Sequence, residues 1–130
     1  MIVLDTHIWV WWVHDPERLT ALQRETIQRH QPDGVRISAF SCWEVAKLVE
    51  YGRLTLPSPI SDWFDQALSG SGINALPLTP EIAIGSTQLP DNFHRDPADQ
   101  IIVATARWHD CLLVTSDRKI LNYAHVKTVG

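Results

Sequence analysis

The sequence places four acidic residues at positions where their carboxylates could do chemistry together. Asp5 follows the apolar run IVL, and Asp117 follows CLLVTS. Glu44 comes early in an apolar segment that begins at Ser41, and Asp99 directly precedes the apolar run QIIVATARW. Carboxylates that converge in one cleft raise one another's pKa, and a divalent cation removes that conflict. An all-oxygen set of ligands favours Mg²⁺ or Mn²⁺ over zinc.

Two of these acids also fit helix starts, which is a purely structural role. The segment DPAD suits a helix that Asp96 caps, with a proline at its first position and Asp99 at its third. The spacing Ser41-x-x-Glu44 matches a capping box, in which the glutamate bonds back to the Ser41 backbone. Taken alone, Asp96 and Asp99 fit helix-start residues, and Glu44 fits capping and chemistry about equally well.

A structural role explains one of the other two acids better than the other. An aspartate after a strand commonly stabilises a turn, and Asp117 fits that description. Asp5 follows a buried-looking strand and precedes another apolar run, where an unpaired carboxylate is costly. The joint placement of all four acids therefore favours a metal site over four separate structural roles.

The elements that must position these acids alternate along the chain. Apolar runs typical of buried strands occur at residues 2–4, 35–40, 73–78, 111–116 and 126–129. Segments with helical spacing of apolar residues lie at 6–14, 17–30, 42–51, 58–68, 81–88, 98–109 and 117–123. In the second of these segments we expect Leu19, Leu22 and Ile27 to face inward. Gly52 follows the third, in the position that commonly ends a helix.

This alternation predicts an α/β fold, a three-layer α/β/α sandwich with a mostly parallel sheet of roughly five strands. In such a fold, sites form beyond the carboxyl ends of the strands. Asp5, Glu44 and Asp117 would then share that edge of the sheet. Asp99 joins them if its helix starts there.

Length and composition set the limits within which these residues act. With 130 residues, we expect a single domain spanning 1–130, and the 45% apolar and 20% charged content is ordinary for globular proteins. The apolar run at 8–13 is far shorter than a membrane span, and the start MIVLD lacks the basic region of a signal peptide. No membrane association is therefore expected.

Cysteine usage and net charge narrow the function classes further. Cys42 and Cys111 lack a CxxC partner or zinc-like spacing, so we expect reduced thiols in a cytoplasmic protein. The net charge of −4 disfavours a general nucleic-acid binder. It argues less strongly against a nuclease that holds a metal in a local acidic site.

Three other functions are compatible with parts of the pattern. A non-enzymatic α/β domain could use its acids as helix caps and bind a partner through its tryptophans. A phosphoacceptor domain of the receiver type also has an acidic pocket at a sheet edge, but it needs paired acids near the first strand, and Asp5 has no acidic neighbour. A phosphatase with DxD chemistry fails because residue 7 is histidine.

Nearly the whole chain resembles the PIN-domain family, specifically the VapC-type toxins of bacterial toxin–antitoxin pairs. The segments that carry the resemblance are IVLDTHIWVWW, SAFSCWEVAKLVEYGRLTL and HRDPADQIIVATARWHDCLLVTSD. The resemblance implies an α/β/α sandwich, usually dimeric, that acts as a Mg²⁺- or Mn²⁺-dependent ribonuclease. It also implies a homodimer, an RNA substrate and a cognate antitoxin that would cover the acidic cleft.

The resemblance also implies roles for individual residues. The family's four metal-binding acids match Asp5, Glu44, Asp99 and Asp117, and Asp96 would support the site from outside. Thr6 and Ser116 fall where the family has hydroxyl residues near the metal, and the role of His7 stays open. In the implied mechanism, a metal-activated water hydrolyses a phosphodiester bond. A carboxylate such as Asp99 would orient or deprotonate that water.

The implied RNA substrate requires basic residues near the acids. Arg95 and Arg118 adjoin the acidic segments in sequence and are the candidates for binding RNA. The simpler interpretation of either residue is a solvated surface side chain. The sequence names neither the RNA that is cut nor the antitoxin.

Overall fold

A single parallel sheet organises the chain in the computed structural model, which describes residues 1–130. The strands run in the order β3-β2-β1-β4-β5, and every neighbouring pair is parallel. Their bounds are β1 (Ile2–Leu4), β2 (Val35–Ser38), β3 (Ile73–Leu76), β4 (Leu112–Val114) and β5 (Thr128–Val129). The predicted α/β class with a parallel five-stranded sheet is confirmed.

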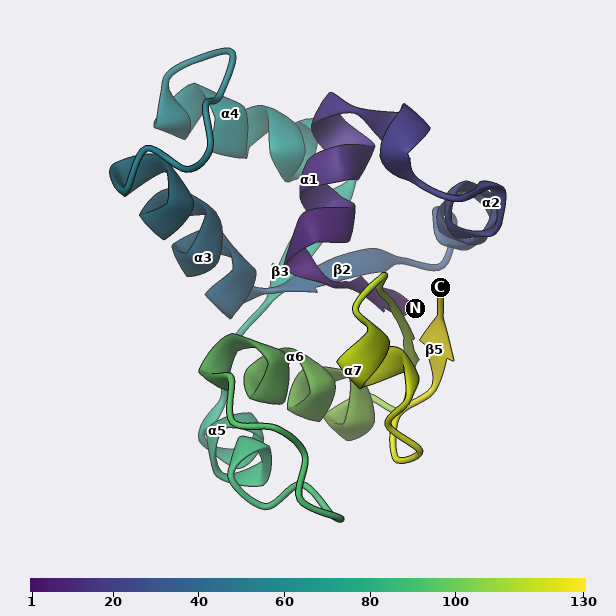
Figure 1. Ribbon diagram of the computed structural model, residues 1–130. Helices are drawn as coiled ribbons and strands as arrows, with labels where there is room; N and C mark the ends of the chain where they lie inside the picture. The colour runs from purple at the N-terminus through teal and green to yellow at the C-terminus, as the bar shows by residue number, and fades with distance from the viewer.

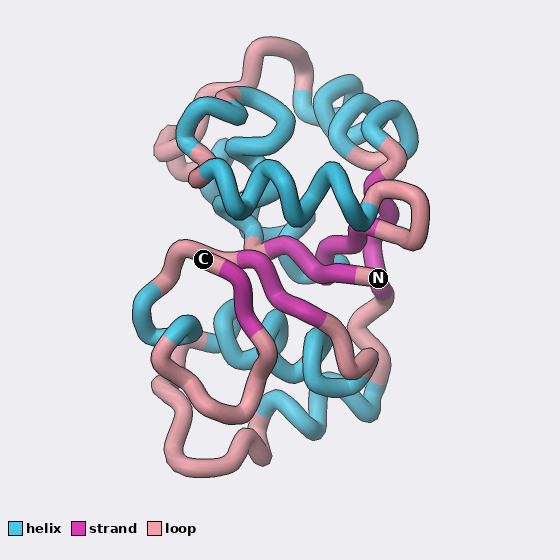
Figure 2. The backbone as a smooth tube through the Cα atoms, turned by 90° about the vertical axis from the view of Figure 1, so that its right-hand side faces the viewer, coloured by secondary structure: helices cyan, strands magenta, loops and turns pink.

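Helices cover both faces of this sheet, as the predicted three-layer architecture requires. The helices α1 to α4 lie on one face, and α5, α6 and α7 lie on the other (Figure 1). Figure 2 shows the strands as a layer between these two groups of helices. The bounds are α1 (Thr6–His14), α2 (Ala21–His30), α3 (Ala39–Glu50), α4 (Ile60–Ala67), α5 (Pro80–Ser86), α6 (Pro97–Trp108) and α7 (Arg118–Leu121), with 3₁₀ turns at Pro16–Arg18 and Ser69–Ser71.

The central strand β1 supplies both faces of the core because its three residues alternate. Ile2 and Leu4 join the larger cluster, under α1 to α4, and Val3 joins the smaller one, against α6. All three side chains are fully buried. An apolar run without alternation is therefore explained by a strand that has helices on both sides.

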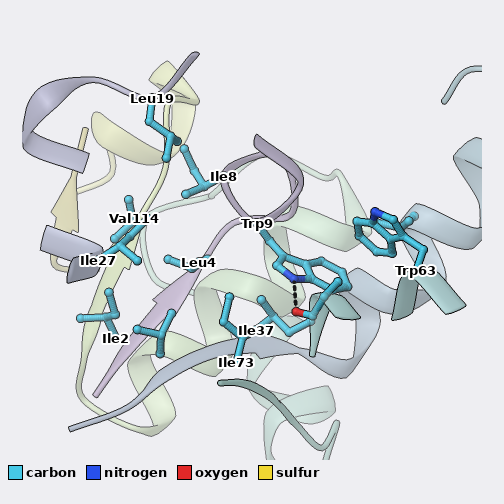
Figure 3. Packing of buried hydrophobic residues seen from close by; sticks show 13 residues of the cluster. Ile2, Leu4, Ile8, Trp9, Leu19, Ile27, Ile37, Trp63, Ile73 and Val114 are labelled. Atoms are coloured by element: carbon cyan, nitrogen blue, oxygen red, sulfur yellow. Dashed lines mark hydrogen bonds between the residues drawn. The ribbon is translucent and has the colours of Figure 1, made fainter. Parts of the chain in front are cut away.

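Two tryptophans fill the larger cluster. The rings of Trp9 on α1 and Trp63 on α4 lie 5.1 Å apart, and both are almost completely buried (Figure 3). The Trp9 indole N–H donates to the Ala67 carbonyl at 3.0 Å, so its polar atom is satisfied inside the core. This contact joins the C-terminal end of α4 to α1.

The boundary between β2 and α3 differs from the prediction. The expected strand at 35–40 ends at Ser38, whose hydroxyl accepts the Phe40 N–H at 3.1 Å and caps α3. The helix therefore begins at Ala39, and Ser41 lies buried inside it. The capping box that Ser41-x-x-Glu44 matches does not form, because Ser38, three residues earlier, caps the helix. The expected end of this helix at Gly52 is confirmed by its left-handed φ of 68°.

The predicted helix over 17–30 is interrupted. It starts at Ala21 in a capping box formed by Thr20 and Gln23, after a separate 3₁₀ turn. Leu19 and Ile27 are buried as predicted, but Leu22 is 52% exposed. The expectation for Leu22 is wrong because the helix starts later, which turns its first residues toward solvent.

Parallel register brings the ends of three strands to the same level. Leu4 pairs with Ile37 on one side and with Val114 on the other. The residues that follow these three are Asp5, Ser38 and Thr115, and the Asp5 N–H donates to the Val114 carbonyl at 2.9 Å. The carboxyl edge of the sheet thus presents polar side chains at one height. None of the helices combines the length and apolarity that a membrane span requires.

Replacing Trp9 with alanine should destabilise the protein by about 3–5 kcal/mol, because it leaves a large cavity and removes the indole hydrogen bond to the Ala67 carbonyl. Urea unfolding followed by circular dichroism measures the change. The matched control is Trp43→Ala on α3, where the side chain is 53% exposed and the loss should stay below about 1 kcal/mol. Equal losses in both variants would contradict the described core.

Candidate active site

The four predicted acids line one pocket of about 270 Å³ at the carboxyl edge of the sheet. Each comes from a different part of the fold, since Asp5 follows β1, Glu44 is on α3, Asp99 is on α6 and Asp117 precedes α7. We call this hollow the acidic pocket. Its lining residues are Asp5, Thr6, His7, Val10, Trp11, Glu44, Leu48, Arg53, Leu54, Asp99 and Asp117.

Asp5 is a buried carboxylate with both oxygens hydrogen-bonded. It caps α1, where Oδ1 accepts the Thr6 N–H at 2.9 Å, and Oδ2 accepts the Thr115 hydroxyl at 2.7 Å. Only 4% of the residue is exposed. The prediction that a structural role explains Asp5 poorly is therefore wrong, because a helix start immediately after a strand provides partners. The imidazole Nδ1 of His7 also lies 3.6 Å from Oδ2.

Thr115 connects two of the acids, and the sequence analysis did not identify it. Its fully buried hydroxyl donates to Asp5 and accepts the Asp117 N–H at 3.0 Å. The register of β1 against β4 indicates this role, because Leu4 pairs with Val114 and the next residues are Asp5 and Thr115. The predicted hydroxyl neighbour, Ser116, is exposed and instead accepts the Gln23 amide at 2.8 Å.

Glu44 is held by a hydroxyl and caps no helix. It lies in the second turn of α3, and the Thr6 hydroxyl donates to its Oε1. The Ser41 hydroxyl lies 2.8 Å from the same threonine oxygen. Burial raises the pKa of Glu44, and the charges of Asp5 and Asp96 add to that effect, while the Thr6 hydrogen bond opposes it. Thr6 thus holds an acid, as its predicted supporting position implies.

Asp99 has the most perturbed carboxyl group of the pocket. Its pKa is raised to about 7. Burial is the largest cause, and the negative charges of Asp5, Asp96, Asp117 and Glu44 add to it. The predicted cap at Asp96 is confirmed, since its Oδ1 accepts the Asp99 N–H at 3.0 Å. Asp96 therefore orients the first turn of α6, and the Asp99 side chain takes no part in capping.

A histidine that the sequence analysis left unassigned lies against Asp99. The His94 Nε2 atom is buried and 3.1 Å from the Asp99 Oδ2 atom, although the pair lacks the geometry of a hydrogen bond. The backbone N–H of Asp96 donates to the other ring nitrogen, Nδ1, at 3.4 Å. That contact favours the tautomer with its proton on Nε2, facing Asp99. No spacing rule could have predicted the pair, because it depends on how the loop before α6 folds.

Asp117 caps the short helix α7, as the turn interpretation predicts. Its Oδ1 accepts the Lys119 N–H at 2.8 Å. The two arginines predicted to bind RNA, Arg95 and Arg118, are exposed and do not line the acidic pocket. The arginine that does line it is Arg53, which the sequence analysis missed because it is far from every acidic segment in sequence.

The donor set of the acidic pocket fits a hard divalent cation. The groups that line it include four carboxylates and a threonine hydroxyl, and no cysteine. Two of the carboxyl pKa values are raised, as expected of acids placed together without a counter-ion. No three His, Cys, Asp or Glu side chains are arranged to hold an ion as they stand.

Comparison with known proteins agrees with this architecture. The chain matches the family model described as PIN domain over residues 2–126. It is 34% identical over 128 residues to Ribonuclease VapC22 of Mycobacterium tuberculosis, which covers 98% of this chain and 95% of that protein.

Solved structures share the fold at lower identity. VapBC2 from Rickettsia felis, bound to a DNA fragment from its promoter, has a TM-score of 0.72 at 15% identity and covers 99% of this chain and 98% of that chain. FitAcB from Neisseria gonorrhoeae has a TM-score of 0.71 at 19% identity, covering 100% and 97%. A toxin–antitoxin complex from Klebsiella pneumoniae has a TM-score of 0.68 at 21% identity, covering 100% and 97%. At these identities, the likeness is one of fold.

Substituting Asp99 with asparagine should remove a pH-dependent loss of stability. The folded pKa of about 7 lies above the ordinary value of 3.8, so the folded state binds the proton more tightly than the unfolded state. The stabilisation that Asp99 gains from this tighter proton binding is fully present below pH 3.8. It is lost as the pH rises through about 7. At pH 8 without metal, Asp99→Asn should exceed the wild type in stability by up to about 4 kcal/mol.

Urea unfolding in EDTA from pH 5 to 8 measures this difference. The matched control is Asp65→Asn, which removes an exposed acid on α4 outside the acidic pocket. Its difference from the wild type should not change with pH in this range. A constant difference for Asp99→Asn would contradict the raised pKa.

Proposed function

Because this chain belongs to the PIN-domain family and to its VapC type, we propose that it is a Mg²⁺- or Mn²⁺-dependent endoribonuclease. In this proposal it acts as the toxin of a toxin–antitoxin pair and hydrolyses RNA phosphodiester bonds. The observation that carries the proposal is the convergence of Asp5, Glu44, Asp99 and Asp117 on one pocket, with the Asp99 pKa raised to about 7.

The four carboxylates would hold the metal, with Thr6 and Thr115 fixing two of them. Thr115 holds Asp5 through its hydroxyl, and Thr6 holds Glu44. Mg²⁺ or Mn²⁺ bound there supplies a water of lowered pKa and neutralises charge on the phosphoryl oxygens. The hydroxyl contacts limit the rotamers of buried Asp5 and half-buried Glu44, so less side-chain ordering would be needed when the ion binds.

Asp99 would orient the attacking water or take its proton. A carboxylate with a pKa near neutral pH is suited to accept a proton at that pH. The His94 Nε2 atom lies 3.1 Å from one of its oxygens, Oδ2. Asp96 positions the same residue through the backbone N–H of Asp99. These two contacts give Asp96 and His94 positioning roles.

An antitoxin partner is supported by the structural neighbours, which include toxin–antitoxin complexes. A hollow of about 410 Å³ adjoins the acidic pocket and shares Val10, Trp11 and Leu54 with it. A partner segment lying there would reach the acids and cover them. The homodimer and the cytoplasmic location stay predictions.

The main alternative is a non-enzymatic interaction domain whose acids cap helices. The capping of α1, α6 and α7 by Asp5, Asp96 and Asp117 supports it. It does not account for Glu44, which caps nothing, nor for the four acids lining a single pocket. Metal binding and metal-dependent RNA cleavage distinguish the proposed nuclease from this alternative.

Mn²⁺ should bind the purified protein and should bind Asp5→Asn at least about tenfold more weakly, because a ligand charge is lost. Isothermal titration calorimetry measures the affinity, and the rise in melting temperature with Mn²⁺ checks it. Asparagine can still cap α1, so the variant should fold. The control Asp65→Asn should bind as the wild type does. Absence of Mn²⁺ binding in the wild type would favour the interaction domain.

Purified protein should cleave total RNA in Mg²⁺ and should lose this activity in EDTA. Asp99→Asn should lower the cleavage rate by about 10²–10⁴-fold, the range that general acid–base catalysis contributes. Sequencing the new 5′ ends identifies the cut sites. Cleavage that persists in EDTA would refute metal dependence, and cleavage unaffected by Asp99→Asn would indicate a contaminating nuclease.

A further inference from the structure

One arginine is the single Lys or Arg residue among those that line the acidic pocket. Arg53 lies beyond the C-terminal end of α3, whereas the arginines adjacent to the acids in sequence, Arg95 and Arg118, lie outside the pocket lining. The mechanism described above gives Arg53 no role. Its place at the rim of a strongly acidic hollow therefore needs its own explanation.

The end of α3 holds the Arg53 backbone in a fixed position. Gly52 adopts a left-handed φ of 68°, and its N–H donates to the Val49 carbonyl at 3.0 Å. The Arg53 N–H then donates to the Leu48 carbonyl at 2.8 Å. These two bonds form a Schellman motif, which turns the chain back toward the helix. The reversal places Arg53 beside the acidic pocket, whose lining it joins.

The guanidinium of Arg53 is free to bind a ligand. Several other arginines have partners, such as Glu25 for Arg29, the His125 carbonyl for Arg107 and the Trp11 ring for Arg18, and the unpartnered Arg95 and Arg118 lie outside the pocket lining. Arg53 forms no ion pair with any carboxylate of the chain, although four of them line the same pocket. The residue is exposed to solvent.

The negative charge of the pocket makes a positive side chain necessary for holding RNA. The chain has a net charge of −4, and the four acids would repel a phosphodiester backbone. A divalent ion would compensate the acids at the cleaved phosphate only. A neighbouring phosphate needs a second positive group, and a guanidinium can donate two parallel hydrogen bonds to it.

We infer that Arg53 binds a phosphate of the RNA strand next to the cleaved one and sets the position of the strand in the acidic pocket. This inference rests on the proposed ribonuclease function. Arg53 contacts substrate and takes no part in proton transfer, so its loss weakens binding more than it slows the chemical step.

Arg53→Gln should raise the KM for a single-stranded RNA about 10–100-fold and change kcat less than about threefold, as expected for a lost charged hydrogen bond. The slope of log(kcat/KM) against log salt should become less negative by about 0.7. Arg53→Lys should keep the salt slope and recover only part of the affinity. The matched control Arg29→Gln removes an exposed arginine of α2 and should change neither quantity.

Fluorescence anisotropy of labelled RNA in Ca²⁺ reports binding independently of cleavage. If the wild type cleaves RNA and Arg53→Gln matches it in KM, binding and salt slope, this inference is overturned and the ribonuclease stands. If Arg53→Gln loses kcat with KM and binding unchanged, the inference is also overturned.

If the wild type binds RNA through Arg53 but never cleaves it, the ribonuclease fails and the phosphate contact stands. If the wild type neither binds nor cleaves RNA, both proposals fail. The Mn²⁺ affinity of Arg53→Gln should not fall, because removing a cation cannot weaken the pocket's attraction for metal. An unchanged melting temperature shows that the variant is folded.

Discussion

The parallel pairing of β1 with β4 is the contact on which the acidic pocket depends. It aligns Leu4 with Val114, so that the next residue on each strand, Asp5 and Thr115, can share a hydrogen bond of 2.7 Å. That bond holds a buried carboxylate, and the same hydroxyl accepts the N–H of Asp117. If β4 shifted by one residue against β1, Asp5 and Thr115 would lie on opposite faces of the sheet. Their hydrogen bond would be lost, and the acids would be separated.

Helix starts do the rest of the positioning. In a parallel α/β fold, a helix that follows a strand begins at the carboxyl edge, so its cap and the site share one location. Asp5 and Asp117 are at once caps and pocket acids, and Asp96 caps the helix that presents Asp99. Structural and chemical explanations of these acids are therefore compatible. A capping role did not exclude a place in the pocket, since Asp5 and Asp117 cap helices and also line it.

The sequence predicted the fold class, the elements and the joint placement of the four acids, because hydrophobic period and strand ends are local signals. It misplaced the start of α3, since Ser38 and Ser41 both fit a cap and only tertiary packing chooses between them. It missed Thr115, His94 and Arg53. Their contacts with the pocket come from strand register, loop conformation and a reversed helix end, none of which leaves a spacing pattern. Arg95 and Arg118 show the converse, since closeness in sequence to an acid did not place them in the pocket.

The helices α1, α3 and α6 all begin at the carboxyl edge, with their N-terminal peptide groups toward the acids. The aligned amide dipoles leave about half a positive charge at each such end. This built-in field offsets part of the repulsion among the carboxylates before any ion arrives. The fold itself therefore stabilises part of the negative charge that it gathers at this edge.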